Sequence, residues 1–356
     1  GGAERVAAAL ANRLSLRGWR VEWRIIDSRP VFDSHSASAL RPEISVRRSG
    51  IGGFVIGFLL LPFKLAGQRY DFVFTTHVYS NAQMSALSMW NLIRVDRFVS
   101  RESTVAFDRF RGLKRAFFGM LYRLYGGQDM ILAQTAYMAR HVKPCLPARC
   151  RHLVAVLPNP VDLDAIDIAM AEDPAADIAK RLAGRINILF CGRLIGVKQP
   201  LLALEVFRRV LTDAHADVAD RLQLVYMGDG PLRADIEKEI RARSLEGSVA
   251  LLGRQANPYA IMSRCQYGLM TSSREGFPNV VLEMMACGVK KIVMTPCAGD
   301  LDDLQGVTVT EDFAAGSLSA ALTASIRAED DFRAAYRKLV EQRTPDAYLD
   351  NILGCN

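Results

Sequence analysis

Short apolar segments alternate with helical patterns through the second half of the chain, and this alternation restricts the possible folds more than any other feature. The expected strands are Asn187–Cys191, Leu222–Met227, Val249–Leu252, Tyr267–Thr271, Lys291–Thr295 and Val307–Val309. Apolar strands separated by helices are typical of a parallel sheet with both faces covered. We therefore predict an α/β domain over residues 166–331.

The first half shows the same alternation less regularly. An Ala-rich helix with one apolar face is expected to end near Gly18, followed by strands at 21–26, 71–77, 95–100 and 129–134. A strand, a glycine loop, a helix and a second strand open a nucleotide-binding α/β domain. We interpret Gly1-Gly2 as that loop, and we expect the first strand to lie upstream of the sequence. The predicted domains are 1–165 and 166–331, with a helix pair at 332–356.

Charge is divided unevenly between the two halves. Residues 1–160 carry a net charge of +13, whereas the remainder carries −6. A basic half is compatible with nucleic acid, an anionic membrane or an anionic substrate. Aromatic and basic residues do not interleave as in nucleic-acid recognition motifs, so no nucleic-acid partner is predicted.

The lengths of the apolar runs and the spacing of the cysteines indicate the cellular compartment of the protein. No apolar run reaches the roughly 18–20 residues that a membrane-spanning helix needs. The seven Cys residues include no Cys-x-x-Cys pair, which argues against a zinc site or disulfide framework and for a reducing compartment. We predict a cytoplasmic protein, either free or peripheral on the inner face of the cytoplasmic membrane. The segment 109–125 mixes basic and large apolar residues, as expected either for a helix on an anionic membrane surface or for a surface helix with a core-facing stripe.

The segment 271–288 predicts a ligand site. It follows an apolar strand, and its Ser, Gly and Pro residues indicate a loop before a helix. Pro278 suits the first helical turn, and Gly288 suits the residue after the helix, where a left-handed conformation is needed. Free N–H groups at such a helix start favour anions. Glu275 and Glu283 supply carboxylates that accept hydrogen bonds from hydroxyl groups, so a phosphorylated sugar fits the combination.

A second motif, Phe190-Cys-Gly-Arg-Leu-Ile-Gly-Val-Lys-Gln-Pro200, places two cations after a strand. Arg193 can hold two phosphate oxygens with its planar fork, and Lys198 adds a point charge. Two cations at the carboxyl end of a strand suit a diphosphate group. The alternative is a basic surface loop.

The sequence Glu-Gly-Phe-Pro-Asn-Val-Val-Leu-Glu at 275–283 resembles the paired-glutamate motif of retaining glycosyltransferases of family 4, which have the GT-B fold. The resemblance extends over nearly the whole chain. It implies two Rossmann-like domains facing each other across a cleft, the first binding an acceptor and the second a nucleotide-sugar. It also implies that the C-terminal helices at 332–356 cross back to the first domain. The implied donor-binding residues are Gly2, Arg193, Lys198, Arg254, Glu275, Gly276, Phe277, Pro278, Asn279, Val280 and Glu283.

In the first domain the resemblance assigns His77, at the end of a strand, a position close to the donor sugar. Relatives often have a second His where this chain has Arg101-Glu102, and we expect these two residues to contact the acceptor. Asp162-Leu-Asp164 superficially matches a metal-binding motif, but its position favours a helix cap. The predicted catalytic residues are His77, Arg193, Lys198 and Glu275, with no metal and no cofactor.

These features predict a transferase that moves a sugar, with retention of anomeric configuration, from a nucleotide-diphosphate-sugar to a glycan, lipid-linked glycan or lipid acceptor. Surface-polysaccharide, lipopolysaccharide or lipid-linked oligosaccharide assembly fits the basic first half and its apolar stretches. Two alternatives remain open: a GT-B glycosyl phosphorylase, and a non-catalytic nucleotide-sugar-binding subunit of a membrane glycosylation complex. The base (UDP, GDP or ADP), the sugar and the acceptor are not specified by these motifs.

Overall fold

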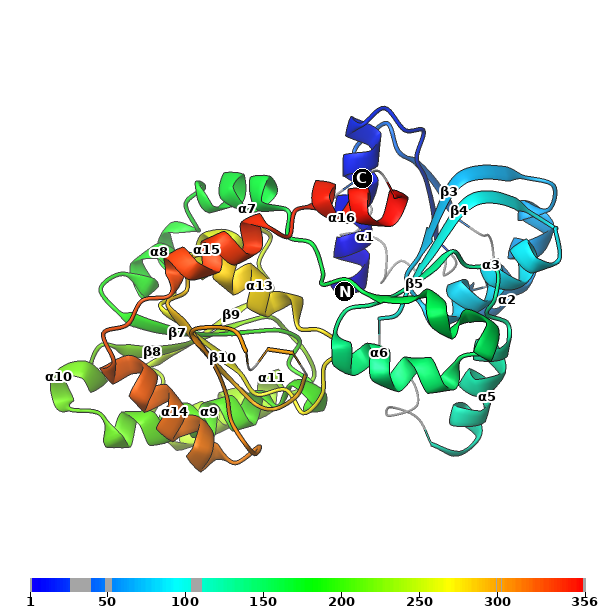
Figure 1. The fold of residues 1–356 in the computed structure, drawn as a ribbon. Coiled ribbons are helices and arrows are strands. Elements are labelled where there is room, and N and C mark those ends of the chain that lie inside the picture. Colours follow the sequence, from blue (N-terminus) through cyan, green and yellow to red (C-terminus); the bar gives the residue numbers. More distant parts are fainter. Residues whose placement is uncertain are drawn as a thin grey trace. The chain divides into compact units, whose positions relative to one another are not determined.

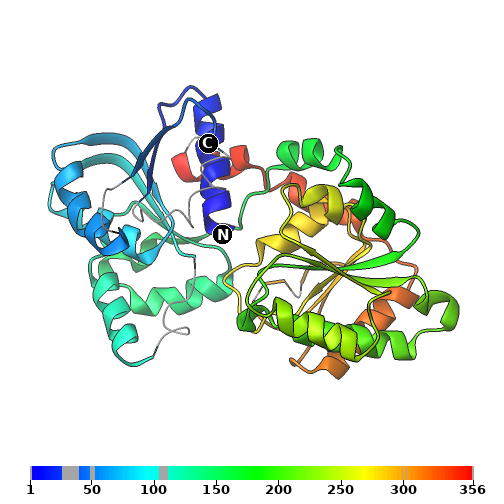
Figure 2. The ribbon, with the colours of Figure 1, turned by 180° about the vertical axis from the view of Figure 1, so that it is seen from behind.

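The computed structural model describes residues 2–25, 40–48, 53–103, 111–298, 300–301 and 303–354. The chain divides into two compact units (Figures 1 and 2). Unit 1 comprises Gly1–Pro160 and Arg343–Asn356, and unit 2 comprises Val161–Gln342. The division at residue 160 lies near the expected domain boundary at 165.

Unit 2 is built on a parallel sheet with the strand order β12-β11-β10-β7-β8-β9. All six predicted strands are confirmed, with small shifts at their ends. They are β7 (Ile186–Cys191), β8 (Leu222–Met227), β9 (Val249–Gly253), β10 (Tyr267–Met270), β11 (Lys291–Met294) and β12 (Val307–Val309).

Helices cover both faces of this sheet, because successive strand residues point to opposite sides. In β7, Leu189 packs into one core, whereas Ile188 and Phe190 pack into the other. The first core includes α7 (Leu163–Met170), α8 (Ala176–Leu182), α12 (Tyr259–Met262), α13 (Asn279–Ala286) and α15 (Arg333–Glu341). The second includes α9 (Pro200–Asp213), α11 (Arg233–Ala242) and α14 (Ala315–Arg327), while the short α10 (Ala216–Ala219) precedes β8.

Helix α13 packs directly on its own strand. A Cβ atom on Gly268 of β10 would lie 2.6 Å from the Met284 sulfur, so any larger residue would have to push the Met284 side chain aside. The helix ends before Gly288, whose φ of +80° confirms the predicted left-handed residue. The position of the loop between β10 and α13 is therefore determined by close packing on both sides.

Unit 1 contains a parallel sheet in the order β3-β4-β5-β6 and a separate parallel pair, β1 and β2. The strands are β1 (Glu22–Ile25), β2 (Ser45–Arg48), β3 (Arg69–Thr75), β4 (Arg94–Arg101), β5 (Met130–Ala133) and β6 (Val154–Val156). Helices α1 (Gly2–Leu16) and α16 (Pro345–Leu353) cover one face of the larger sheet. The other face is covered by α2 (Gly53–Leu65), α3 (Val78–Met89), α5 (Gly112–Arg123) and α6 (Ala136–Val142).

Two predictions are revised. Gly2 was expected in a loop, but it lies in the first turn of α1, because the helix-forming residues after it continue the helix back to this position. Of the two helices at 332–356 that were expected to cross back to the first domain, α16 does so and α15 does not. Tyr336 of α15 packs into unit 2, whereas Tyr348 and Leu349 of α16 pack against α1 and the sheet of unit 1. Among the described residues, no helix combines the length and apolarity that crossing a membrane requires.

Candidate functional site

The strand order of unit 2 reverses between β7 and β10, which pair side by side. From β7 the chain proceeds outward through β8 and β9, and from β10 it proceeds the other way through β11 and β12. The loops that follow the two strands at such a reversal run in opposite directions, and a crevice opens between them at the carboxyl edge of the sheet. Open α/β sheets bind ligands in this crevice. The two loops at this point, 192–199 and 271–278, carry the two strongest motifs of the sequence.

Hydrogen bonds join these two loops. The Thr271 hydroxyl donates to the carbonyls of Lys198 and Gln199 at 3.0 and 2.9 Å. The Ser273 N–H donates to the Val197 carbonyl at 2.8 Å. Lys198 and Glu275 form an ion pair whose side chains are 23% and 14% exposed. The structure therefore places a cation and a carboxylate from separate motifs next to each other.

The carboxylate loop is also attached to the next strand connection. The Glu275 N–H donates to the Cys297 carbonyl at 2.8 Å. Burial raises the pKa of the Cys297 thiol to about 12, so the thiol beside this loop stays protonated at neutral pH. Cys297 is a buried member of the first core of unit 2.

A glycine turn holds the loop that carries Arg193. A Cβ on Gly228, which has a φ of +141°, would lie 2.0 Å from the Gly192 carbonyl oxygen. A Cβ on Gly230 would lie 2.5 Å from the Leu194 carbonyl oxygen. The Leu194 N–H also donates to the Asp229 carbonyl at 2.9 Å. The backbone on both sides of Arg193 is thus clamped, while the Arg193 side chain itself is exposed.

The remaining predicted donor residues follow the same edge of the sheet. Pro278 was expected in the first turn of α13 and instead caps it, with the helix beginning at Asn279. Glu283 lies half-buried farther along α13, and Arg254 is exposed directly after β9. These positions are compatible with a ligand lying along the carboxyl ends of β7, β9 and β10. Their contacts with a donor remain predictions.

In unit 1, His77 lies after β3 and occupies the position before α3, without a capping hydrogen bond from its side chain. The imidazole is half-exposed, with Nδ1 3.2 Å from the Ser103 hydroxyl and Nε2 3.7 Å from the Glu4 carboxylate. The hydrogen bond from His77 is the largest cause of the lowered pKa of Glu4. Glu4 was not predicted as a site residue from the sequence. The one feature that could have indicated it is its position as an acidic residue in the first turn of the first helix. A carboxylate beside Nε2 can set the orientation of the ring.

Arg101 and Glu102 lie at the buried end of β4, with side chains that are 1% and 0% exposed. Arg101 donates to Asn159 Oδ1 at 2.6 Å through Nη2. Glu102 accepts hydrogen bonds from the Tyr125 hydroxyl at 2.6 Å and from Asn81 Nδ2 at 3.0 Å. Burial lowers the pKa of Arg101 and raises that of Glu102.

This burial corrects the expectation that Arg101 and Glu102 contact the acceptor. Both side chains make their hydrogen bonds inside unit 1, because the end of a central strand is covered on both faces of the sheet. Through Asn81 in the first turn of α3, Glu102 instead holds the helix that begins beside His77. The two residues position this edge of the sheet rather than facing a ligand.

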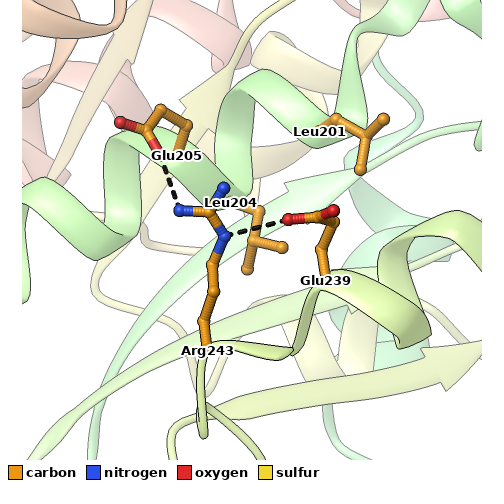
Figure 3. A pocket seen from close by; sticks show the side chains of 5 residues that line it. All are labelled: Leu201, Leu204, Glu205, Glu239 and Arg243. Carbon is orange, nitrogen blue, oxygen red and sulfur yellow. Dashed lines mark hydrogen bonds and ion pairs between the residues drawn. The ribbon is translucent and has the colours of Figure 1, made fainter. Parts of the chain in front are cut away.

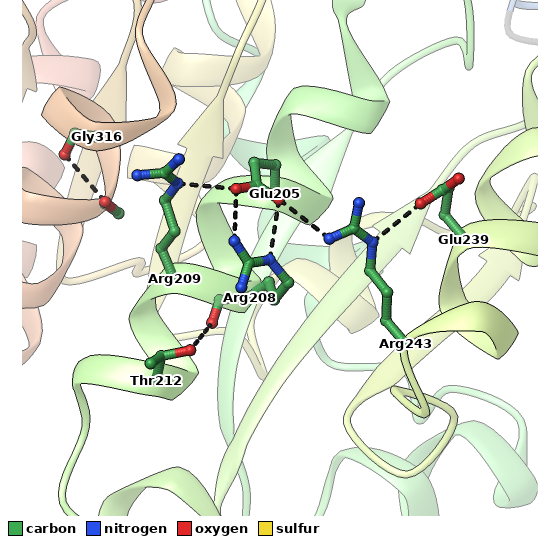
Figure 4. Close-up of polar contacts among 8 residues, drawn as sticks. Glu205, Arg208, Arg209, Thr212, Glu239, Arg243 and Gly316 are labelled. Carbon is green, nitrogen blue, oxygen red and sulfur yellow. Dashed lines mark hydrogen bonds and ion pairs between the residues drawn. The ribbon is translucent and has the colours of Figure 1, made fainter.

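A surface hollow of about 240 Å³ lies between α9 and α11, and none of the predicted site residues lines it (Figure 3). Leu201, Leu204, Glu205, Glu239 and Arg243 line it. Its charges are already paired. Glu205 contacts Arg208, Arg209 and Arg243 at 2.8, 2.9 and 3.4 Å, and Arg243 also reaches Glu239 at 2.9 Å (Figure 4). Because these charged side chains pair with one another, the hollow is a poor ligand site. We infer that its ion pairs stabilise the packing of α9 and α11.

The Asp162-x-Asp164 motif is a helix cap, as predicted. Asp162 precedes α7, and its carboxylate accepts a hydrogen bond from the Ala165 N–H at 3.3 Å. In the described part of the chain, no group of three or more His, Cys, Asp or Glu side chains is arranged to hold a metal ion.

The chain resembles known proteins in both sequence and structure. Residues 185–328 match the sequence model of the family described as "Glycosyl transferases group 1". The chain is 28% identical, over 309 residues, to a Campylobacter jejuni protein named N-acetylgalactosamine-N,N'-diacetylbacillosaminyl-diphospho-undecaprenol 4-alpha-N-acetylgalactosaminyltransferase; the match covers 81% of this chain and 75% of that protein.

Solved structures show the same fold. Anabaena HepE in complex with UDP superposes with a TM-score of 0.76 at 15% identity, covering 100% of this chain and 97% of that one. The apo form of the lipopolysaccharide outer core galactosyltransferase WaaB gives 0.70 at 17% identity, covering 100% and 96%. The chain therefore has the GT-B fold, and the part of it that matches the group 1 family model, residues 185–328, lies in unit 2.

Proposed function

We propose that this protein transfers a sugar, with retention of anomeric configuration, from a nucleotide-diphosphate-sugar to a lipid-linked glycan. The observation that carries the proposal is the meeting of Lys198 and Glu275 where the sheet order of unit 2 reverses. The Campylobacter relative, whose name describes transfer to a diphospho-undecaprenol acceptor, supports the acceptor class. The HepE complexes with UDP and with UDP-glucose make a uridine donor the first candidate.

In this proposal the bond between the sugar carbon and the donor diphosphate breaks as the bond to the acceptor oxygen forms. Negative charge develops on the departing diphosphate, where Arg193 and Lys198 supply positive charge. The departing phosphate takes the acceptor proton, so no separate base is required. We assign no metal and no cofactor to these steps.

The carboxylates bind hydroxyl groups. Glu275 stands beside Lys198 and would accept from the sugar hydroxyls, while Glu283 on α13 would accept from the ribose. His77, the predicted sugar contact of unit 1, would donate a further hydrogen bond.

Arg193→Ala tests the proposal. The release of UDP, GDP or ADP from the matching sugar donors is measured in the presence of membrane-extracted acceptor. Loss of one charged group that stabilises a leaving group lowers the rate on the order of 10²–10³-fold. Arg241→Ala is the matched control, because it removes an exposed Arg from the same unit at the end of α11. Equal turnover by the two variants would contradict the assignment of Arg193.

The same assay separates the alternatives. A phosphorylase would release sugar phosphate only when inorganic phosphate is added. A non-catalytic subunit would be stabilised by a nucleoside diphosphate in a thermal shift experiment but would not turn over any donor, even with acceptor.

A further inference from the structure

Gln199 has a backbone conformation that its own sequence context does not favour. Its φ of +47° and ψ of +54° lie in the left-handed region, where the Cβ of an L-residue comes close to the following carbonyl oxygen. Gln199 also precedes Pro200, and a proline ring pushes the residue before it toward extended backbone. Among the residues that the structure describes, four non-glycine residues have a positive φ, and of these only Gln199 precedes a proline. Contacts from elsewhere in the fold must therefore hold this conformation.

The loop that follows β10 supplies hydrogen bonds to this part of the chain. The Thr271 hydroxyl donates to the Lys198 and Gln199 carbonyls at 3.0 and 2.9 Å. The Ser273 N–H donates to the carbonyl before them, that of Val197, at 2.8 Å. Three consecutive carbonyls of loop 192–199 thus accept hydrogen bonds from two residues of loop 271–278.

The Thr271 hydroxyl is placed to fix the conformation of Gln199. The two carbonyls that it contacts lie on either side of the Gln199 Cα, so their relative direction depends on the φ and ψ of this residue. A hydroxyl carries one hydrogen, which both carbonyls can share only while they point to the same place. Thr271 is 0% exposed, so its surroundings keep the hydroxyl at this position.

The left-handed conformation of Gln199 in turn sets the direction of Lys198. It separates the short helical turn Gly196–Lys198 from α9, which begins at Pro200. In this conformation the Lys198 ammonium pairs with Glu275. If Gln199 relaxed to the extended backbone that a following proline favours, the turn would rotate relative to α9 and Lys198 would leave its partner.

We propose that Thr271 is a positioning residue for Lys198. Its hydroxyl holds Gln199 in the left-handed conformation, and this conformation presents the Lys198 ammonium beside Glu275 at the carboxyl edge of the sheet. The inference rests on the role that the proposed function gives to Lys198. Thr271 touches neither donor nor acceptor, because its side chain is 0% exposed, and it acts through the backbone of the neighbouring loop.

Thr271→Val tests this proposal, because it removes the hydroxyl and keeps the branched shape of the side chain. Release of nucleoside diphosphate from the sugar donor is measured with membrane-extracted acceptor. We expect kcat to fall roughly 10–100-fold, because a displaced charged group loses most of its effect on the departing diphosphate. The donor KM should change less, since this charge develops only as the bond breaks. Thr271→Ser keeps the hydroxyl and should retain most of the turnover.

Thr310→Val is the matched control. Thr310 is 8% exposed, and its hydroxyl donates to the Met294 and Asp312 carbonyls at 3.3 and 2.7 Å. The control therefore removes a comparable buried hydroxyl from unit 2 without changing the bonds to loop 192–199. Its kcat should match that of the unmodified chain.

Thr271→Val/Gln199→Gly separates positioning from packing. Glycine lacks the Cβ that makes the left-handed region unfavourable, so residue 199 can adopt this conformation without the hydroxyl. The double variant should recover about fivefold or more of the kcat that Thr271→Val loses. A loss caused by poorer packing around residue 271 would not be recovered by a change at residue 199.

The reactivity of the Lys198 amine gives a second readout that needs no turnover. Acetylation by acetic anhydride is followed by mass spectrometry and compared with that of Lys180, an exposed residue of α8. Lys198 is 23% exposed in its pair with Glu275. Thr271→Val should raise the labelling of Lys198 severalfold and leave that of Lys180 unchanged, and the double variant should lower it again.

Three results would overturn the proposal: a kcat of Thr271→Val equal to that of the unmodified chain, unchanged labelling of Lys198 in this variant, or no recovery in the double variant. If the unmodified chain turns over no donor, the proposed function fails. The labelling of Lys198 in the single and double variants then still decides the role of Thr271, so the two proposals can fail separately.

Discussion

Gly228→Ala tests whether a single glycine contact holds the loop of Arg193. The Cβ of alanine would lie 2.0 Å from the Gly192 carbonyl oxygen, so the two backbones must separate by more than about 1 Å to reach an ordinary contact. The φ of +141° adds strain, because side chains rarely adopt it. Strain of this kind costs about 1–3 kcal/mol, and displacing packed backbone costs a similar amount. The free energy of unfolding of unit 2 should therefore fall by about 2–6 kcal/mol.

For a unit of this size, that loss lowers the midpoint of thermal unfolding on the order of 5–20 °C. The three Trp residues of the chain, Trp19, Trp23 and Trp90, all lie in unit 1, so their fluorescence follows that unit selectively. We expect the transition measured by far-UV circular dichroism, which includes unit 2, to move well below the one measured by fluorescence. Thermal stabilisation by UDP should weaken at the same time, since the loop of Arg193 is displaced.

Gly247→Ala is the control for this experiment. Nothing lies within 4 Å of the added Cβ, and φ is not positive. Its stability should remain within about 1 kcal/mol of the unmodified protein. If Gly228→Ala and Gly247→Ala unfold at the same temperature and respond equally to UDP, the close approach of the two loops does not hold the site.

Two further predictions concern buried or paired carboxylates. Hydrogen bonds from Arg208 are the largest cause that lowers the pKa of Glu205 from 4.5 to about 2, so its stabilising contribution is present above pH 4.5 and is lost as pH falls toward 2. Glu205→Gln should lower the free energy of unfolding by about 1 kcal/mol or less at pH 7, since these ion pairs are partly exposed. Denaturant titrations of the variant and the unmodified protein should give the same free energy of unfolding near pH 2. A difference that persists at this pH would contradict the role of the Glu205 charge. Glu102→Leu removes the acceptor of Tyr125 and Asn81, and unfolding followed by Trp fluorescence should show a loss of about 2–4 kcal/mol. Tyr125→Phe in the same background should recover part of it, and no recovery would refute the hydrogen-bond explanation.

Local patterns were sufficient to predict the architecture. The strands of unit 2 were found within a residue or two, because a strand buried on both faces must be apolar along its whole length. The cap at Asp162 and the left-handed Gly288 were also predictable, since each depends on a few neighbouring residues. Arg193, Lys198 and Glu275 were selected because their charges follow strand ends, where ligands of parallel sheets bind.

Contacts between distant segments could not be predicted in the same way. The pairing of Lys198 with Glu275 depends on β7 and β10 being neighbours, which is a property of the sheet order. Arg101 and Glu102 were placed at a ligand because relatives often have a second His at this position, but the residues packed around this strand end bury them. Gly2 and the division of the last two helices between the units were likewise decided by packing. The sequence encodes each apolar face and each strand end, and the tertiary structure selects their partners, because burial depends on every segment that packs at the same place.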